Sequence, residues 1–501
     1  MKGTLSVAIA NLLARVTGVA REIVLSAMFG VGLATDAYFA ALRVPQLLRE
    51  LLAEGSLQNA FVPSFSEATE KEGPDGAWRL ANAFLGILLL ALGATTLIFL
   101  LGAPLWVRVV ANGFTGEKLA LATSMTRWLS PMLAGLSLAG FAGAMLNVRG
   151  RFFLPALATN ALNLLVIAGC LLAERFSAWT GLAPIVAVAL ATTLSGFVQL
   201  AVTLPALFRE GFRFRPTFGG HPGLAKMLAF LGPALIGIST VQFNLLVESQ
   251  WASHYGDGPL SWLVLSFRLV QLPLAVVSGS VAVAALTALS LHSARGETDA
   301  LGEGLTRALR LNATLVIPSA VALGVLAEPL TRLFFERGAF TPADTAGTAA
   351  MLRMYAFAVY GICFHRVALP IYYALGDPRT PMRLSIGAML AKVPVVLLLT
   401  QVLGLGVEAL PLSHAITVSG ECVLLAHGFR AHVRGRGLWL AHAKIAVAAC
   451  VLAGLAFVLR ERLHVIWVCA ISGGAYLGVA AGLGVRDFLP PPPPGRGKVA
   501  A

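Results

Sequence analysis

The chain has 501 residues, of which 57% are hydrophobic and 12% are charged, and its mean hydropathy is +0.80. Soluble domains carry about 25% charged residues, so this composition excludes an ordinary soluble protein and predicts an all-α polytopic membrane protein. The net charge of +13 at pH 7 would by itself suggest a nucleic-acid partner. The positions of the basic residues along the chain give a different explanation for this net charge.

The apolar stretches predict fourteen transmembrane helices, each of about 20–30 residues and so long enough to cross a bilayer. With both termini in the cytoplasm, 21 of the 37 basic residues fall on the inside and seven on the outside, as the positive-inside rule requires. The positive net charge is therefore explained by the orientation of the helices in the membrane, and we expect no nucleic-acid partner. The predicted spans are 4–29, 36–65, 80–107, 119–147, 152–173, 181–208, 223–253, 260–291, 304–327, 345–375, 382–403, 406–429, 438–459 and 464–484.

An internal repeat relates the two halves of the chain at a spacing of about 225 residues: LGAPL at 101–105 recurs as LAEPL at 326–330, and NGFT and ALRVPQL recur as GAFT and SFRLVQL. Six helices fit in one period, which predicts two pseudo-symmetric six-helix lobes in the same orientation plus two C-terminal helices. The predicted domains are an N-terminal lobe at 1–215, a C-terminal lobe at 216–435, the two added helices at 436–485 and a disordered Pro-rich tail at 486–501.

The most informative stretch is 11–67, which predicts two helices that meet at GVGLATD, where Thr35 and Asp36 can cap the second helix. Charges at membrane depth are costly, so they usually face a bundle interior or a watery cavity. This predicts a wet, charged interior. The charged residues of the stretch are Arg15, Arg21, Glu22, Asp36, Arg43, Arg49, Glu50 and Glu54.

Helical spacing divides these charges into two kinds. Arg15 and Glu22 are seven residues apart and share a face, and the acids Asp36, Glu50 and Glu54 share a face with Arg43. By contrast, Arg21 and Arg49 have no acid one turn away on their own face. They are candidates for a ligand-facing positive charge, together with Arg268 of the second half. The alternative, that these arginines pair with neighbouring acids or reach the membrane surface, stays open.

The runs ARVTGVARE and FGVGLATDAYFAALRVPQLLRELLAEGSLQNAFVPSFSE resemble the MviN/MurJ family of lipid II flippases, part of the multidrug/oligosaccharidyl-lipid/polysaccharide exporter superfamily. The resemblance implies a bacterial inner-membrane transporter that carries the undecaprenyl-diphosphate-linked peptidoglycan precursor to the outer leaflet, for cell-wall synthesis and cell shape. Its implied partners are lipid II, membrane lipids and the cell-wall synthesis machinery. The resemblance also implies that the two added helices form a hydrophobic groove for the polyprenyl chain, although plain bundle packing would fit their sequence equally well.

The same resemblance implies roles for individual residues. Substrate-binding residues of the central cavity would be Arg15, Arg21, Arg49 and Arg268, with Glu22, Asp36, Arg43 and Glu54 adjusting the cavity charge. The chain departs from the family pattern in the helix of Arg268, where SFRLVQLP replaces ADRLMEFP, so that Phe267 and Gln271 replace two acids. The lost carboxylates make the predicted cavity more positive.

A second polar pair is predicted in the second half, where Glu248 and Lys392 each lie alone in an apolar span. They form either a buried ion pair or a coupling site, in which Glu248 binds a cation or proton or Lys392 permanently takes the place of one. The sequence contains no clustered metal ligands and no nucleotide-binding loop, so we expect neither a cofactor nor an enzyme. The driving force would be the membrane potential or a monovalent cation.

Two other functions compete with lipid II export. The first is export of another lipid-linked oligosaccharide or of a drug-like cation by the same architecture. A cation exporter should have an acidic cavity, whereas this one is predicted to be basic. The second is an enzyme or scaffold that acts on polyprenyl phosphates. The missing catalytic cluster argues against an enzyme, and a scaffold should tolerate loss of Arg21 and Arg49.

Overall fold

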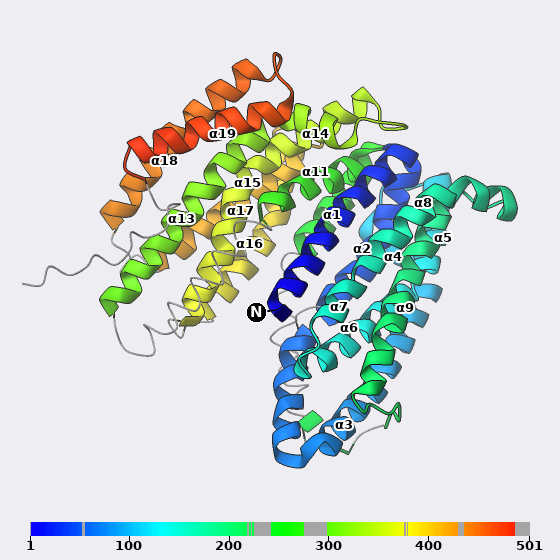
Figure 1. The fold of residues 1–501 in the computed structure, drawn as a ribbon. Coiled ribbons are helices and arrows are strands. Elements are labelled where there is room, and N and C mark those ends of the chain that lie inside the picture. The colour runs from blue at the N-terminus through cyan, green and yellow to red at the C-terminus, as the bar shows by residue number, and fades with distance from the viewer. Residues whose placement is uncertain are drawn as a thin grey trace, which may run out of the picture. The chain divides into compact units, whose positions relative to one another are not determined.

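The computed structural model describes residues 2–52, 56–217, 220–221, 223–224, 242–274, 298–374, 377, 379–428 and 435–485. Every regular element in these residues is helical (Figure 1), which confirms the predicted all-α class. The elements are α1 (Lys2–Phe29), α2 (Leu33–Leu52), α3 (Ser56–Leu101), α4 (Ala103–Val110), α5 (Gly116–Leu129), α6 (Met132–Val148), α7 (Phe153–Ala158), α8 (Asn160–Thr180), α9 (Ile185–Arg209), a helix at 242–252, η1 (Ser253–Tyr255), α11 (Pro259–Pro273), α13 (Thr298–Val325), α14 (Ala327–Phe335), α15 (Pro342–Ala374), α16 (Arg379–Leu397), η3 (Leu398–Val402), α17 (Ala409–Gly428), α18 (Gly435–Leu459) and α19 (Val465–Gly482).

Ten helices in the described part of the chain are long and apolar enough to cross a membrane. Each overlaps a span predicted from the sequence, and large apolar side chains such as Leu171 and Val423 are exposed on their surfaces. Exposed leucine and valine on a spanning helix suit contact with lipid tails. The protein is therefore a multi-pass membrane protein. The total of fourteen spans stays a prediction.

The helix boundaries around residue 73 differ from those predicted. The sequence predicts a loop between spans 36–65 and 80–107, but α3 continues through this region for 46 residues, with one break at Gly73 (φ 73°, ψ −177°). Glycine adopts this conformation readily because it has no Cβ, and Pro74 then suits the first turn of the next helical segment because it has no N–H to leave unpaired. The chain therefore bends sharply at one residue.

The internal repeat appears in the local structure of both halves. LGAPL leads into the short helix α4 and LAEPL into the short helix α14, in each case directly after a long helix. The helices that follow, α5 and α15, begin at Gly116 and Pro342, again at the predicted spacing. Repeated sequence thus produces repeated local structure, while the predicted domain boundaries and lobe arrangement stay predictions.

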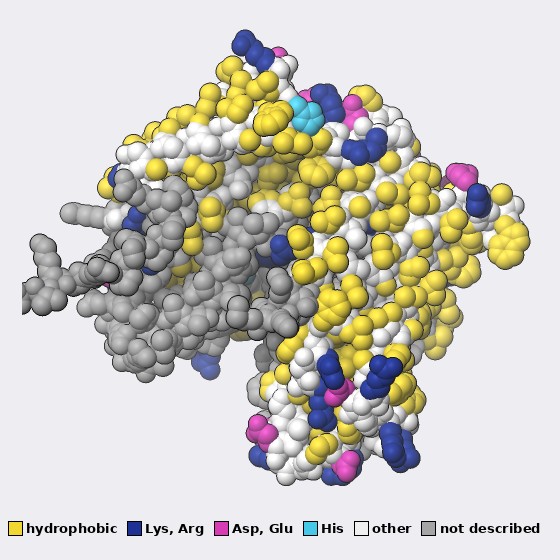
Figure 2. Space-filling view, in the orientation of Figure 1, with side chains coloured by type: hydrophobic (Ala, Val, Ile, Leu, Met, Phe, Trp, Pro, Cys, Tyr) yellow, Lys and Arg dark blue, Asp and Glu magenta, His cyan; other side chains and the backbone are white. Residues whose placement is uncertain are grey.

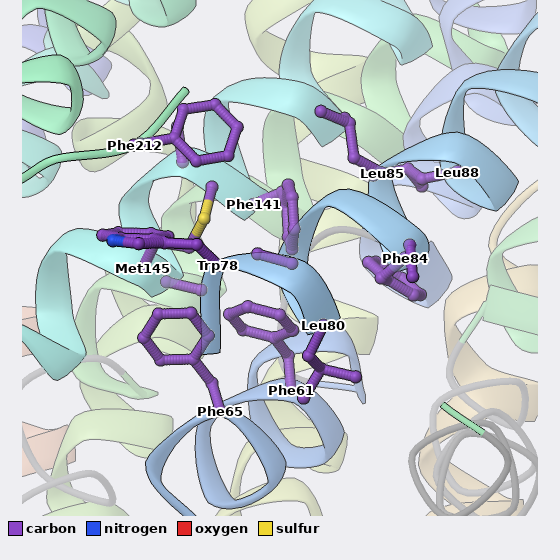
Figure 3. Close-up of a cluster of buried hydrophobic side chains, with 14 of the residues drawn as sticks. Phe61, Phe65, Trp78, Leu80, Phe84, Leu85, Leu88, Phe141, Met145 and Phe212 are labelled. Atoms are coloured by element: carbon purple, nitrogen blue, oxygen red, sulfur yellow. The ribbon is translucent and has the colours of Figure 1, made fainter. Parts of the chain in front are cut away.

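The contacts between residues divide the chain into two compact units. Unit 1 contains Met1–Trp262 and Phe335–Asp344, and unit 2 contains Leu263–Phe334 and Thr345–Ala501. On the face shown in Figure 2, apolar side chains cover the helices of unit 1 along their length and charged side chains gather near their ends. The main core of unit 1 lies between α3 and α6 and is rich in aromatic side chains, including Phe61, Phe65 and Phe141 (Figure 3).

In unit 2, the C-terminal helices pack on α13. Ile445 and Ala448 of α18 are fully buried there, and the Tyr476 hydroxyl of α19 donates a hydrogen bond to the carbonyl oxygen of Thr314 (2.6 Å). At the start of α16, the Asp377 carboxylate accepts hydrogen bonds from the side chain and backbone N–H of Thr380 and from the backbone N–H of Arg379, and these bonds lower the pKa of Asp377. Whether α18 and α19 also form the predicted lipid groove stays a prediction.

Two glycines bring α6 and α9 into backbone contact. A Cβ added at Gly196 would lie 2.8 Å from the backbone nitrogen of Leu136, and one at Gly135 would lie 2.8 Å from the backbone of Gly196. Small residues permit this close approach between membrane helices. We expect Gly196→Leu to force the helices apart and to destabilise the protein by about 3 kcal/mol, measured by thermal unfolding in detergent. Gly454→Leu is the control because a Cβ at Gly454 meets open space; equal unfolding temperatures for the two variants would contradict the expectation.

Candidate functional site

The candidate site begins with Arg21 on α1, whose side chain is only 17% exposed. Its Nη2 donates to Glu22 Oε1 at 2.5 Å, and its Nη1 donates to Asn163 Oδ1 of α8 at 3.1 Å. Hydrogen bonds that involve charged groups are among the strongest in proteins. The guanidinium of Arg21 is therefore held in one place by an acid on its own helix and by an amide on the neighbouring helix.

The polar groups of α8 extend this network along α1. The Asn163 side-chain amide donates both to the carbonyl oxygen of Ala14 (3.1 Å) and to Thr17 Oγ1 (3.0 Å). The Thr17 hydroxyl also lies 3.0 Å from Asn160 Oδ1. Because Asn160 and Asn163 are three residues apart on one helix, both face α1. The result is a polar seam between two largely apolar helices.

For Arg21, the structure shows the alternative that the sequence left open, because Arg21 pairs with the neighbouring acid Glu22. The argument from helix faces follows the direction of each Cβ, but an arginine side chain is long enough to reach back to the adjacent residue, here Glu22. Glu22 is 5% exposed, so its pairing with Arg21 occurs in a buried environment. Arg15, predicted to share a face with Glu22, lies nearer the start of α1 with an exposed side chain.

A second buried ionic cluster surrounds Asp36, which is 1% exposed. One carboxylate oxygen accepts from Lys118 Nζ and from the Gly258 N–H, both at 2.8 Å. The other accepts from the N–H (2.8 Å) and the hydroxyl (2.6 Å) of Ser261. Lys118 also bonds to the Gly256 carbonyl (2.9 Å) and pairs with Asp257 (3.0 Å). This cluster lies within unit 1 and joins segments more than 200 residues apart.

The predicted helix cap at residues 35–36 is half correct. Thr35 Oγ1 accepts from the backbone N–H of Gly32 at 3.0 Å, which satisfies a group at the start of α2. The Asp36 carboxylate, however, binds the first N–H groups of α11 rather than those of its own helix. A carboxylate at the positive end of a helix dipole is favourable wherever in the chain it comes from. The prediction that Asp36 caps α2 is therefore wrong.

The other predicted residues of unit 1 are described to different extents. Arg43 Nε donates to Ser249 Oγ at 3.0 Å, and the adjacent Glu248 is 2% exposed. Arg49 lies in α2, but its side chain and the whole of Glu54 fall outside the described residues.

Two predicted residues belong to unit 2. Arg268 in α11 donates from Nη1 to Gln271 Oε1 at 3.2 Å, one turn further along the helix. Lys392 is fully buried, and its Nζ donates to the carbonyl oxygen of Leu410 at 3.3 Å. Glu248 lies in unit 1 and Lys392 in unit 2, so their pairing stays a prediction.

Sequence reasoning missed Asn163 and Lys118 as partners of the predicted site residues. A signal for Asn163 was present, because two asparagines three residues apart are unusual in an apolar span. Lys118 gave no such signal, since it stands in a segment predicted to lie outside the membrane. Within the described residues, no group of three His, Cys, Asp or Glu side chains could hold a metal ion.

Comparisons with known proteins place this arrangement in a family. The family model for the lipid II flippase MurJ matches residues 25–473. A lipid II flippase MurJ from Burkholderia cenocepacia is 33% identical over 76% of this chain and 74% of its own length. A probable lipid II flippase MurJ from Vibrio cholerae is 30% identical over 98% of this chain and 95% of its own length.

Solved structures agree at the level of the fold. A lipid II flippase MurJ structure in an inward closed conformation superposes with a TM-score of 0.81 at 21% identity, covering 95% of this chain and 97% of the other. An inward-facing multidrug transporter of the MATE family gives 0.71 at 16% identity, covering 85% and 97%. Because the family model matches most of the sequence and the Vibrio relative aligns over nearly the whole of both chains, this chain belongs to the MurJ family of lipid II flippases.

Proposed function

We propose that this protein moves lipid II from the inner to the outer leaflet of the bacterial cytoplasmic membrane by alternating access, as a step of cell-wall synthesis. Family membership supports this substrate. The observation that carries the proposal is Arg21, a largely buried cation on α1 whose position is fixed by Glu22 and Asn163. Such a charge is costly in a membrane helix, so its presence there supports a functional role.

The diphosphate of lipid II would be bound by Arg21, Arg49 and Arg268, with Arg15 contributing to the positive potential. Arginine suits this task because its planar fork donates two parallel charge-assisted hydrogen bonds to phosphate oxygens. The acids Glu22, Asp36 and Glu54, with Arg43, would adjust the net charge of the cavity. Arg43 donates a hydrogen bond to Ser249, and Asp36 pairs with Lys118. These contacts support a role for both residues in holding the structure together as well as in setting the cavity charge.

For the whole molecule, we propose fourteen spanning helices in two six-helix lobes plus two, with both termini in the cytoplasm. Rocking of the lobes would expose the site to either side, and a ligand shifts that equilibrium only by its differential affinity for the two states. The membrane potential can supply roughly 2.3 kcal/mol per charge per 100 mV, so it is a sufficient driving force without a nucleotide. The similarity to MATE transporters rests on the fold alone, so drug export is not favoured.

Complementation of a strain depleted of its lipid II flippase tests the proposal. Wild type should restore growth, and Arg21→Ala, Arg49→Ala and Arg268→Ala should each fail at matched membrane levels. Arg175→Ala is the control, because Arg175 is an exposed basic residue on α8 outside the predicted site. Rescue by all three variants would leave the transport function standing and remove these residues from the site. Failure of a well-expressed wild type would contradict the function itself.

A further inference from the structure

A second basic site lies in unit 1, away from the polar seam of α1 and α8. A cavity of about 1000 Å³ opens beside the Gly73 break of α3, and we call it the α3 pocket. It is lined by three segments that the positive-inside rule predicts to be cytoplasmic: the start of the second part of α3, the end of α6, and the chain after α9. Its basic lining residues are Arg79, Arg149, Arg213, Arg215 and His221.

Asn82 of α3 fixes the segment that carries Arg213 and Arg215. Its side-chain amide donates to the Arg213 carbonyl (3.1 Å), and its side-chain oxygen accepts from the Arg215 N–H (2.8 Å). The backbone oxygen of Asn82 also accepts from the N–H of Thr217 (3.2 Å). One asparagine therefore holds the backbone of both arginines against α3.

Trp78 lines the α3 pocket and contacts Arg149. The Arg149 guanidinium lies over the indole ring, 5.1 Å from its centroid. The indole is itself held edge-on by Phe65 (5.3 Å) and Phe212 (5.5 Å) in the aromatic core of unit 1 (Figure 3). A guanidinium held over a ring keeps N–H groups, which lie in its own plane, available for other acceptors.

The described acids around the α3 pocket form no ion pair with these three arginines, although Asp75 and Glu210 also line the pocket. Glu72 lies within 3.4 Å of both Arg79 and His221, and Glu210 pairs with Arg151 at 2.9 Å. Among the described residues, no carboxylate lies within ion-pair distance of Arg149, Arg213 or Arg215. The Arg149 Nε is buried and has no hydrogen-bond partner in the same residues. A buried donor left unsatisfied is costly, so an acceptor that reached this N–H would stabilise the folded protein.

We propose that the α3 pocket binds a phosphate group, carried either by the head group of an anionic phospholipid or by a soluble phosphate. Three arginines on two fixed segments match the several oxygens of a phosphate, whose charge they can share through charge-assisted hydrogen bonds. A volume of about 1000 Å³ admits a head group as well as a free anion. None of the residues proposed to bind the lipid II diphosphate lines the α3 pocket. The pocket would therefore bind its phosphate separately from the transported substrate.

Binding to the purified full chain in a non-ionic detergent tests this site without lipid II. The probes are inorganic phosphate and a short-chain phosphatidylglycerol, each titrated at constant ionic strength by calorimetry. The variants are Arg149→Gln and the double variant Arg213→Gln with Arg215→Gln. The control is Arg209→Gln, which removes the same charge from an exposed residue outside the pocket lining.

We expect at least one probe to bind wild type saturably. The pocket variants should bind that probe with an affinity lower by about tenfold or more, because each variant loses charge-assisted hydrogen bonds. The control should bind like wild type. Saturation with inorganic phosphate would identify a soluble ligand, and saturation with phosphatidylglycerol alone would identify a lipid head group. No saturable binding, or equal weakening by Arg209→Gln, would overturn the proposal. The double variant changes only exposed side chains, so the test survives if Arg149→Gln fails to fold.

Discussion

Replacing Asp36 with alanine is expected to destabilise the folded protein by about 4 kcal/mol, because it leaves a buried Lys118 without its main counter-charge. The side chain of Lys118 is 8% exposed, and Asp36 also accepts three hydrogen bonds from the start of α11. Asp36→Asn should cost less, since its amide oxygen can still accept from Ser261. The measurement is the free energy of unfolding in detergent for the series Asp, Asn, Ala.

Two further variants test whether the ion pair is the cause. Asp36→Ala combined with Lys118→Met should recover part of the lost stability, because the second change removes the uncompensated charge. Glu117→Gln, at an exposed acid beside Lys118, should change stability by less than about 0.5 kcal/mol. An unfolding free energy for Asp36→Ala equal to that of Glu117→Gln would show that the cluster does not stabilise the protein.

Replacing Arg21 with alanine is expected to lower the affinity for lipid II by about 10- to 100-fold, the loss that charge-assisted hydrogen bonds to a diphosphate predict. Arg21→Lys should retain part of the affinity because it keeps the charge but loses the planar fork. Glu22→Gln should act in the opposite direction, since it removes the competing carboxylate that now accepts from Arg21. The measurement is a titration of each purified variant with lipid II.

The folding of these variants must be measured beside their binding. Arg21→Ala leaves Glu22 buried without its arginine, so a loss of stability alone could reduce binding. The double variant Arg21→Ala with Glu22→Gln removes both charges and should restore stability without restoring affinity. If this double variant binds lipid II as tightly as wild type, Arg21 positions structure and does not contact the diphosphate.

The helices and several local features could be predicted from the sequence because they depend on residues near one another. The apolar spans, the repeat that produces α4 and α14, and the Thr35 contact with Gly32 are of this kind. The break at Gly73 was missed because the chain around it is too polar to be recognised as spanning helix, although it continues as helix. Here a Gly-Pro pair marked a bend between helical segments and not a loop.

The partners of the site residues could not be predicted because they lie far apart in the sequence. Asn163 is 142 residues from Arg21, and Ser261 is 225 residues from Asp36. Helix periodicity gives the face on which a residue stands, but it does not give the neighbour that the fold brings to that face. Polar residues in apolar spans were reliable signals that a site exists, and weak signals of what each residue contacts.

Transport of labelled lipid II by the purified protein in liposomes is the most direct test of the central claim. Fluorescent lipid II is incorporated in both leaflets, a membrane potential is imposed, and an impermeant reductant then destroys the label in the outer leaflet only. With wild type, the destroyed fraction should exceed that of protein-free vesicles, and Arg21→Ala should abolish the excess. An equal destroyed fraction in protein-free vesicles and in vesicles with correctly folded wild type would contradict lipid II translocation by this chain.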